Sequence, residues 1–558
     1  MNVTSLNRRA GSAFLSISRR AFHRARYAPF AVHILKGNPA PEPREQFSVI
    51  NPATGEDLCT VEAASKTDVE QAVQDAHATF KSGVWSNAPA HQRAMVLTRL
   101  ARALEARIPE FAQVETLQTG RAIREMRAQL GRLPEWLDYY SAVLRTHSAY
   151  VPPTQGQLLN YVQRVPLGVV AQITPFNHPL LIALKKIAPA LAAGNSVIVK
   201  PSELAPITVL EFAEMAVEAG VPPGVLSILP GYGRTTGKDL VSHPLVRKVD
   251  ITAGTSTGRA IGAIVGANLA SYTAELGGKA PVVVFDDADV ESAVNGAAFA
   301  SFVASGQTCV SGARLIVQTK IYDAFMARFL DKVKSITKRM GDTMNPLSTM
   351  GTVISPFHLD RIHKMVKERS SGSILAGGEP LKGKSEIDGF DFSQGSFFPP
   401  TVIVDVSTED EIWKEEIFGP VVVVKRFQVK RAYAISQSDM LTSGDYFPNI
   451  QDEQDGVSLA NDCKYGLGAG IWTSNLSRAH RVAAQLESGL VWINTHHRND
   501  PSSPWGGMKE SGIGRENGLE ALDAYSQSKS TIVNVASAEE SRQRDDWFTE
   551  GAVAKRYG

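Results

Sequence analysis

A cysteine and a glutamate supply the clearest chemistry in this sequence. Cys309 ends the run Ser305-Gly306-Gln307-Thr308-Cys309, and Glu275 lies 34 residues before it. A thiolate attacks electrophilic carbon well, but a free thiol is mostly protonated at neutral pH and needs a base or a helix N-terminus beside it. The pair therefore predicts a thiol nucleophile and a carboxylate base. An inert buried cysteine is the alternative interpretation of Cys309.

The elements around these residues indicate an α/β protein. Helical periodicity is strong over Asp68–Phe80 and over His91–Thr119, and the apolar-rich stretch 293–304 predicts a helix before Cys309. Short apolar runs then alternate with helices, which is typical of βαβ units on a parallel sheet. These runs are 169–173, 196–200, 225–229, 249–251, 281–285, 421–424 and 490–493. We expect two doubly wound domains with Cys309 facing a cleft between them.

Six separated segments together resemble one family. They are, in order, Thr174-Pro175-Phe176-Asn177-His178-Pro179, Lys200-Pro201-Ser202-Glu203, Glu275-Leu276-Gly277-Gly278-Lys279, Gly306-Gln307-Thr308-Cys309, Glu416-Ile417-Phe418-Gly419-Pro420 and Pro504-Trp505-Gly506-Gly507. The sequence is similar to the NAD(P)-dependent aldehyde dehydrogenase superfamily, from roughly Phe47 to Val535. The resemblance implies an α/β fold of aldehyde dehydrogenase type, with two doubly wound parallel-sheet domains and a small β oligomerisation element.

The domain limits that follow are these. Residues 42–146 and 167–276 form an NAD-binding domain, 277–523 a catalytic domain, and 147–166 with 524–535 the oligomerisation hairpin and strand; 536–558 is a C-terminal tail without a role that we can derive. In the family the C-terminal strand crosses to a neighbouring subunit, so a homodimer or homotetramer is expected. Both segments alternate in the manner of exposed strands, and a free strand edge is normally covered or paired.

The resemblance also assigns catalytic roles. Cys309 attacks the aldehyde, and the resulting thioester is hydrolysed by water that Glu275 activates. The Asn177 side chain and the Cys309 backbone N–H would stabilise the oxyanion, and Lys186 matches a family lysine near it. Lys185 and Lys186 are adjacent, and either could instead be a helix-surface charge.

The same resemblance implies NAD as the cofactor. The matching residues are Thr174, Phe176, Lys200, Ser202, Glu203, Gly254, Thr255, Glu416 and Phe418. A carboxylate at Glu203 would accept hydrogen bonds from the adenine ribose and repel a 2′-phosphate, which favours NAD over NADP. Gly254 stands where the family usually has serine, a residue that can cap a helix and meet phosphate, and Thr255 is the candidate substitute.

Two rival functions stay open. The first is a coenzyme A-acylating semialdehyde dehydrogenase, and Glu275 argues against it because members of that type lack this glutamate. The second is a catalytically silent structural protein of the same fold, against which the intact Cys309, Glu275 and Asn177 argue. The substrate is a small aldehyde of unknown identity, and Arg498 in the run 496–500 would meet an acidic or polar aldehyde or merely a neighbouring loop.

Composition excludes several other classes. The content of 43% hydrophobic and 21% charged residues is ordinary for a soluble protein, and no apolar run approaches a membrane span. The three cysteines, Cys59, Cys309 and Cys463, are too widely spaced for a disulfide framework or a zinc site, so no metal is expected. Removing the seven positive charges of residues 1–41 from the net charge of +1 leaves about −6, which gives no sign of nucleic-acid binding.

The N-terminal segment and one internal insertion raise separate hypotheses. Residues 1–41 hold six arginines and no acid, as in a mitochondrial transit peptide and linker, so we expect the mitochondrial matrix, or the cytoplasm if the extension is not a transit peptide. Residues 429–451 have no counterpart in the family pattern. They are either a surface loop or a retained intron, since valine codons begin GT, Gln451 can be CAG, and 23 codons keep the frame.

Overall fold

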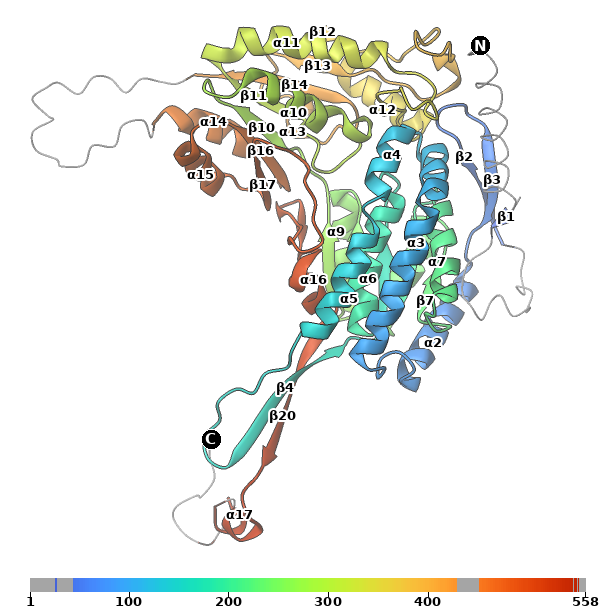
Figure 1. Ribbon diagram of the computed structural model, residues 1–558, viewed down its shortest axis with the longest axis vertical. Helices are drawn as coiled ribbons and strands as arrows, with labels where there is room; N and C mark the ends of the chain where they lie inside the picture. Colours follow the sequence, from blue (N-terminus) through green and yellow to red (C-terminus); the bar gives the residue numbers. More distant parts are fainter. Residues whose placement is uncertain (1–25, 28–43, 429–450, 545, 549, 551–558) are drawn as a thin grey trace, which may run out of the picture.

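The computed structural model describes residues 26–27, 44–428, 451–544, 546–548 and 550. Two helix-covered sheets form the body, and a two-stranded ribbon projects from it (Figure 1). The predicted α/β class with parallel-sheet domains is confirmed, whereas the domain limits stay a prediction. Except for Arg26–Tyr27 and Gln451, the transit-peptide segment 1–41 and the insertion 429–451 lie outside the described residues.

The first sheet carries the strands that end at the predicted cofactor residues. Its order is β19-β9-β8-β5-β6-β7, and all neighbours are parallel except β19 with β9. The strands are β5 (Val169–Ile173), β6 (Ser196–Lys200), β7 (Leu226–Ile228), β8 (Val246–Thr252), β9 (Ser271–Glu275) and β19 (Gly512–Ile513). The apolar runs predicted at 169–173 and 196–200 thus form β5 and β6 with the same limits.

Alternate side chains of these strands enter two cores. Val169, Ala171 and Ile198 pack beneath α2, α8 and α9, while Val170, Val197 and Val199 pack against α3, α5, α6 and α7. The helices are α2 (Lys66–Ser82), α3 (Ala90–Thr119), α5 (Pro134–Thr146), α6 (Pro179–Ala193), α7 (Ile207–Glu218), α8 (Lys238–Ser242) and α9 (Thr255–Ala267), with α4 (Ile123–Leu130) following α3.

The second sheet has the order β12-β13-β14-β11-β10-β16-β17 and is parallel except for β12. Its strands are β10 (Pro281–Val284), β11 (Arg314–Gln318), β12 (Ser373–Ala376), β13 (Thr401–Val404), β14 (Val421–Phe427), β16 (Gly468–Trp472) and β17 (Leu490–Ile493). One face packs on α10 (Val290–Phe302) and α11 (Thr319–Lys338). The other packs on α12 (Pro356–Lys367), α13 (Glu411–Lys414), α14 (Gln451–Asn461) and α15 (Leu476–Gln485).

Shorter elements complete the body. They are β1 (Arg26–Tyr27), β2 (Gln46–Ile50) and β3 (Asp57–Glu62) in a small sheet, β15 (Tyr465–Gly466) with β18 (Met508–Lys509), the π-helix η2 (Gly233–Gly237), the 3₁₀ helices η3 (Val303–Gly306) and η4 (Phe392–Gln394), and the helices α16 (Gly518–Ala524) and α17 (Ala538–Arg544).

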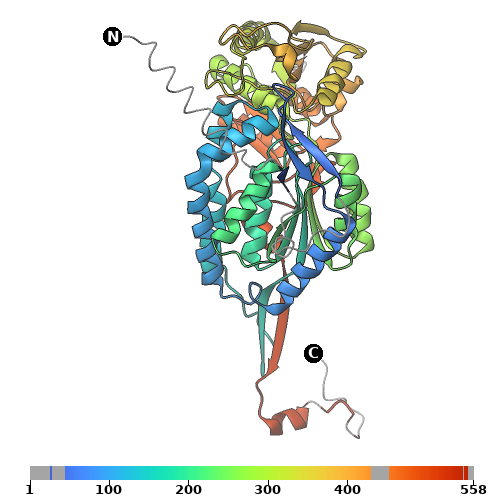
Figure 2. The same ribbon diagram turned by 90° about the vertical axis from the view of Figure 1, so that its right-hand side faces the viewer.

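The projecting ribbon pairs β4 (Leu158–Pro166) with β20 (Ser526–Asn534) in antiparallel register, from Pro166 opposite Ser526 to Leu158 opposite Asn534. It extends well beyond the helices of the body in a second view (Figure 2). The C-terminal strand was expected to cross to a neighbouring subunit, but here it pairs along its whole length with β4 of its own chain. The backbone N–H and C=O groups of β20 that face β4 are hydrogen-bonded within the chain. Any contact with a neighbouring subunit would therefore use the faces and outer edges of the ribbon.

The loop that presents Cys309 begins where α10 ends at Phe302. Three consecutive residues of η3 then adopt left-handed backbone angles, with φ of 54° at Ala304, 53° at Ser305 and 68° at Gly306. A Cβ at Gly306 would lie 2.0 Å from the carbonyl oxygen of Gly419, which precedes β14. Glycine is therefore required at this position both by conformation and by the close approach of another backbone.

Replacing this glycine tests how far the loop depends on it. Gly306→Ala should lower the free energy of unfolding by roughly 1–3 kcal/mol, because alanine must take a strained φ against the Gly419 carbonyl. It should also reduce activity by displacing Cys309. Gly266→Ala is the matched control, since open space surrounds the Cβ position of that helical glycine. Denaturant unfolding of both variants checks the difference, and equal stabilities would contradict this account of the loop.

Candidate active site

The predicted residues of the first sheet gather at one edge. Strands β5, β6 and β9 end at Ile173, Lys200 and Glu275, and the carboxyl ends of parallel strands share an edge. Thr174 directly follows β5 and donates its backbone N–H to the Lys200 carbonyl oxygen at 3.1 Å. The hydroxyl oxygen of Thr174 is buried without a hydrogen-bond partner in the described part of the chain.

Three distant segments meet at Cys309. A Cβ at Gly278 would lie 1.9 Å from the Cys309 carbonyl oxygen, so the segment after β9 lies directly against this residue. The Asn177 side chain donates from Nδ2 to the Gln307 carbonyl oxygen at 2.8 Å, two residues before Cys309. Cys309 also packs against the apolar cluster that contains Trp505. The structure thus brings together the predicted nucleophile, the predicted oxyanion donor and the segment of the predicted base.

Glu275 is a buried carboxyl group without a partner. Its side chain is 2% exposed, and neither carboxyl oxygen has a hydrogen-bond partner within the described residues. A Cβ at Gly506 would lie 2.8 Å from the Gly514 carbonyl oxygen and 3.0 Å from Oε1 of Glu275, so the Gly506 segment packs closely on the carboxyl group. Burial, and next the charge of Glu516, raise the pKa of Glu275 well above its usual range. A carboxyl group in this state is ready to accept a proton as soon as it ionises.

The pKa of the Cys309 thiol is also raised. Burial, with further contributions from Glu416 and Glu275, raises its pKa to about 12. The resting thiol is therefore protonated at neutral pH and becomes a nucleophile only when a neighbouring group takes its proton.

The predicted cofactor residues form a second group beside this one. The Lys200 ammonium lies 3.1 Å from Glu203 Oε2, and burial lowers its pKa. Glu416 Oε1 accepts the Gly278 N–H at 3.0 Å, and burial raises the pKa of Glu416 to about 7. The Phe176 and Phe418 rings meet edge to face at 5.7 Å.

The helix N-terminus predicted to meet phosphate is also present. Gly254 is the N-cap of α9 and makes no side-chain cap, and no atom lies within 4 Å of its Cβ position. The Thr255 hydroxyl, the candidate substitute for the missing serine, donates to the Glu510 carbonyl oxygen at 3.4 Å. Ser202 Oγ accepts the Leu204 N–H at 3.3 Å and thus holds the turn that carries Glu203.

Lys186, which was predicted near the oxyanion, lies in a buried ion-pair network. Its side chain is fully buried, and its ammonium lies 2.5 Å from Asp250 Oδ1 and in contact with Glu516 Oε1. Burial alone would lower the pKa of Lys186, but these carboxylates raise it above its usual value. Its catalytic role stays a prediction, since the structure shows it in an ion-pair network.

The ion pair between Lys185 and Glu516 in this network was not predicted. Glu516 also pairs with Lys185 at 2.8 Å, and against the opposing effect of burial the two lysines lower the pKa of Glu516 to about 2. The adjacent lysines are buried, so the surface-charge interpretation is wrong. A usable signal was present: α6 is otherwise almost entirely apolar, and lysine is almost never buried without a partner.

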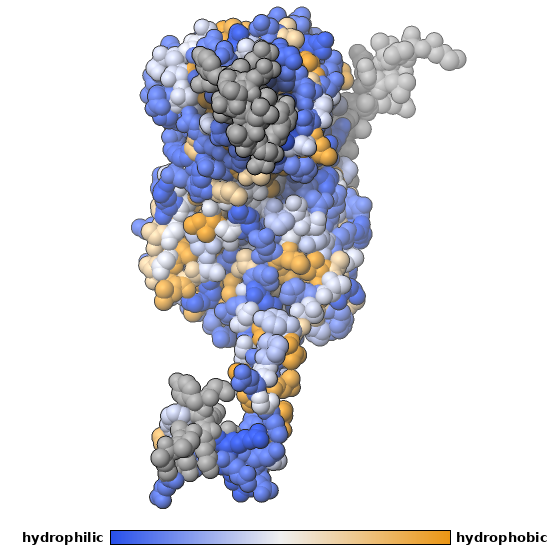
Figure 3. Space-filling model, turned by 90° about the vertical axis from the view of Figure 1, so that its left-hand side faces the viewer, coloured by the Kyte–Doolittle hydropathy of each residue, from blue (hydrophilic) through white to orange (hydrophobic). Residues whose placement is uncertain are grey.

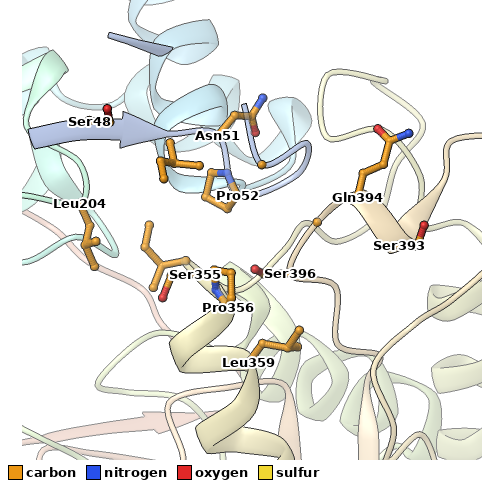
Figure 4. Close-up of a pocket in the computed structure, with 14 residues that line it drawn as sticks. Ser48, Asn51, Pro52, Leu204, Ser355, Pro356, Leu359, Ser393, Gln394 and Ser396 are labelled. Carbon is orange, nitrogen blue, oxygen red and sulfur yellow. The ribbon is translucent and has the colours of Figure 1, made fainter. Parts of the chain in front are cut away.

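A separate cavity of about 420 Å³ lies beside Leu204, the residue after Glu203. Figure 4 shows the side chains that face this space, which come from β2 and the residues directly after it, from the start of α12 and from the segment around Gln394. The residues around it carry no ionised side chain and include none of the predicted catalytic residues. It is therefore a different space from the site around Cys309.

The chain also matches a known protein family. Residues 40–444 and 446–531 match the sequence profile of the Aldehyde dehydrogenase family. The chain belongs to the aldehyde dehydrogenase family.

Solved structures of similar chains extend this result. PnpE from Pseudomonas sp. WBC-3 is 38% identical, with a TM-score of 0.80 over 88% of this chain and 95% of that one. The P. syringae indole-3-acetaldehyde dehydrogenase AldA, solved with NAD+ and IAA, is 32% identical, with a TM-score of 0.83 over 93% and 99%. Betaine aldehyde dehydrogenase from Staphylococcus aureus, solved with NAD+, is 33% identical, with a TM-score of 0.83 over 93% and 97%.

Within the described residues no group of three His, Cys, Asp or Glu side chains is arranged to hold a metal ion. None of the helices in the described ranges is long and apolar enough to cross a membrane.

The ion-pair network gives a stability prediction. Glu516→Gln should lower the free energy of unfolding at pH 7 by roughly 3–5 kcal/mol, because Lys185 loses its carboxylate partner inside the protein. The folded-state pKa of Glu516 is lowered, so its contribution is complete above about pH 4.5 and disappears as the pH falls toward 2. Unfolding curves at several pH values should show the gap between variant and wild type narrowing in that window.

Glu510→Gln is the control for this experiment. Glu510 pairs with Arg259 at the surface, at 2.7 Å, where both side chains are well exposed. Its loss should change stability by less than about 1 kcal/mol. An effect of Glu516→Gln no larger than that of the control would contradict the role given to the buried network.

Proposed function

We propose that Cys309 and Glu275 carry out the oxidation of an aldehyde to a carboxylic acid with NAD+ as the electron acceptor. The observation that carries this proposal is the buried, unpartnered carboxyl group of Glu275 near a partly buried thiol. A buried polar group without a partner is costly, so it indicates a reactive role when it lies next to a nucleophile.

The first step is attack of the Cys309 sulfur on the aldehyde carbon, with the thiol proton passing to the ionised form of Glu275. The oxyanion that forms receives hydrogen bonds from the Cys309 backbone N–H and from Asn177. An amide group has two N–H donors, and one of those of Asn177 is held by the Gln307 carbonyl, which leaves the second for the oxyanion. One such donor typically lowers the barrier by about 3 kcal/mol.

The later steps turn the adduct into the acid. NAD+, when bound, accepts the hydride that the thiohemiacetal carbon expels. Glu275 then releases the thiol proton to solvent, water attacks the thioester left on Cys309, and Glu275 takes a proton from that water. Cleavage of the C–S bond releases the carboxylic acid and restores the thiol.

The surroundings of the cofactor residues fit NAD+. The unpartnered Thr174 hydroxyl, the open N-terminus of α9 and the Lys200–Glu203 pair supply donors and an acceptor along one edge. Glu203 is one-third exposed, so its carboxylate is available to the ribose hydroxyls and opposes a 2′-phosphate. Glu416 would hold the second ribose, with Phe176 and Phe418 beside the nicotinamide.

Water, and not coenzyme A, is the acyl acceptor in this proposal. A coenzyme A thiol loses its proton far more readily than water does, so attack by water depends more strongly on a general base. The buried Glu275 meets that need, which favours the hydrolytic reaction over the acylating alternative.

Assembly and location are part of the proposal. The ribbon exposes Leu158, Leu159, Ile532, Val533 and Val535, and hydrophobic side chains lie along it (Figure 3). Apolar surface on a projecting element is normally covered by a partner, so we infer a homodimer or a dimer of dimers. The arginine-rich N-terminal sequence supports import into the mitochondrial matrix.

Variants of the two reacting residues test the mechanism. Cys309→Ala should abolish aldehyde-dependent NADH formation while NAD+ binding persists, because only the nucleophile is lost. Glu275→Gln should lower steady-state turnover by about 100-fold or more. In the wild type, turnover should rise with pH through the raised pKa of Glu275, and this rise should vanish in Glu275→Gln.

Cys463→Ala is the matched control, since Cys463 is a partly exposed free thiol away from these contacts, and it should retain full activity. The product of the wild-type reaction is identified by mass spectrometry with and without coenzyme A. Substantial turnover by Cys309→Ala would overturn the nucleophile, and an acyl-coenzyme A product would overturn the role of Glu275.

Truncation tests the assembly. A chain that stops at Ser528 loses most of β20, which exposes the inner edge of β4 and removes Ile532 and Val533. We expect the oligomer to fall apart into monomers or to aggregate, as seen by sedimentation velocity. A wild-type protein that sediments as a stable monomer would refute the proposed interface.

A further inference from the structure

Arg121 is a buried arginine that the mechanism does not use. Its side chain is 1% exposed, and it directly follows Gly120, whose left-handed conformation ends α3. Burial of a guanidinium group is costly unless carboxylate or carbonyl oxygens accept its N–H groups. The positions of these acceptors therefore show which parts of the chain Arg121 holds in place.

One side of the guanidinium group contacts the segment of the predicted oxyanion donor. Nη1 of Arg121 donates to the backbone carbonyl oxygen of Asn177 at 3.0 Å and lies 2.6 Å from Nδ1 of His178. The same nitrogen donates to Oε1 of Gln129 at 2.9 Å. These contacts fix the backbone of Asn177, whose Nδ2 reaches the Gln307 carbonyl oxygen in the loop of the nucleophile.

The other side of the guanidinium group reaches the loop of the nucleophile through a carboxylate. Nη2 of Arg121 donates to Oε1 of Glu125 at 2.6 Å, and the same oxygen accepts the Ala304 N–H at 2.9 Å. Ala304 is the first of the residues with left-handed backbone angles that precede Cys309. Such angles at a residue other than glycine persist only where the surroundings hold them, and the Glu125 carboxylate is one of the groups that do so.

The backbone turn between α3 and α4 supports this loop from a second side. The Gly120 carbonyl oxygen accepts the Thr352 N–H at 2.9 Å, and a Cβ at Gly351 would lie 1.9 Å from that oxygen. Ser305 Oγ in turn donates to the Gly351 carbonyl oxygen at 3.0 Å. The left-handed loop is therefore held from this part of the chain both by a charged side chain and by backbone contacts.

We propose that Arg121 is a positioning residue for the reaction at Cys309. It holds Asn177 directly and the left-handed loop through Glu125, so the oxyanion donor and the nucleophile keep one fixed separation. This inference rests on the proposed function, from which it takes the roles of Asn177 and Cys309. A displacement of about 1 Å between reacting groups can lower the rate about 100-fold, so an ion pair that fixes them supports turnover without itself reacting.

The test follows the attack of Cys309 on 4-nitrophenyl acetate, an activated ester that stands in for the natural aldehyde. The thiol gives its proton to Glu275, the sulfur displaces 4-nitrophenolate and forms a thioester, and water then hydrolyses that thioester. The oxyanion of this attack uses the same Asn177 donor. Release of 4-nitrophenolate by the full-length enzyme is measured by absorbance, and Cys309→Ala gives the background rate.

Two variants of Glu125 test the contact with the loop. Glu125→Ala removes the acceptor, whereas Glu125→Gln keeps a carbonyl oxygen that can accept from both Ala304 and Arg121. Glu125→Ala should lower the kcat of ester hydrolysis by about tenfold or more, while the Kd of NAD+ stays at its wild-type value. Glu125→Gln should restore kcat to within about threefold of the wild type.

A double-mutant cycle tests Arg121 itself. Arg121→Lys keeps the positive charge, but an ammonium group presents its donors from one atom and cannot serve Asn177 and Glu125 from two sides. This variant should lower kcat by about tenfold or more. In an Asn177→Ala background the same substitution should have an effect at least about threefold smaller, because the donor that it positions is already absent.

Glu105→Ala is the matched control, because Glu105 pairs with Arg102 at the same distance of 2.6 Å on the exposed surface of α3. It should leave kcat unchanged. A wild-type kcat in Glu125→Ala would overturn the inference, even if the variant unfolded more easily, since that is the result of a purely structural ion pair. An effect of Arg121→Lys that is equally large in both backgrounds would overturn it as well. Ester hydrolysis that disappears in Cys309→Ala would leave the proposed nucleophile standing in either case, so the two failures are distinguishable.

Discussion

The Glu516 carboxylate holds the two sides of the active site together. It lies between two lysines of α6, in a segment that reaches the first sheet through β19. Residues 512–516 thereby fix the end of β9, where Glu275 stands opposite Gly512. The arrangement concentrates buried charge near a buried carboxyl group and a partly buried thiol. The buried lysines are paired with Glu516 and Asp250. The reacting groups can therefore lie in a region of low polarity without an unpaired buried ion beside them.

Exclusion of water from this site is the common cause of its raised pKa values. Burial is the largest effect on the pKa values of Cys309, Glu275 and Glu416, and all three are raised. A nucleophile that is protonated at rest avoids side reactions with solvent. Once Glu275 ionises, it can take the thiol proton as an aldehyde arrives, which is general base catalysis.

Sequence reasoning worked where local rules decide structure. The helix ending at Gly120 in a left-handed conformation, and the strands β5 and β6, follow from periodicity and cap residues. It failed at Lys185 and Glu516, because the contact joins positions about 330 residues apart and a lysine pair gives no local sign of its partner. The left-handed angles of Ala304 and Ser305 were equally hidden, since neither residue type favours them.

The pairing of β20 with β4 and of β19 with β9 has a consequence for how the chain is made. β19 completes the first sheet, whose other strands lie between 169 and 275, and β20 completes the separate ribbon with β4, so these contacts have very high contact order. During synthesis the first sheet lacks an edge strand, and Lys185 and Lys186 lack Glu516, until residues 512–516 have left the ribosome. Folding of this part is therefore a late event, and the growing chain depends on protection from aggregation until these residues arrive.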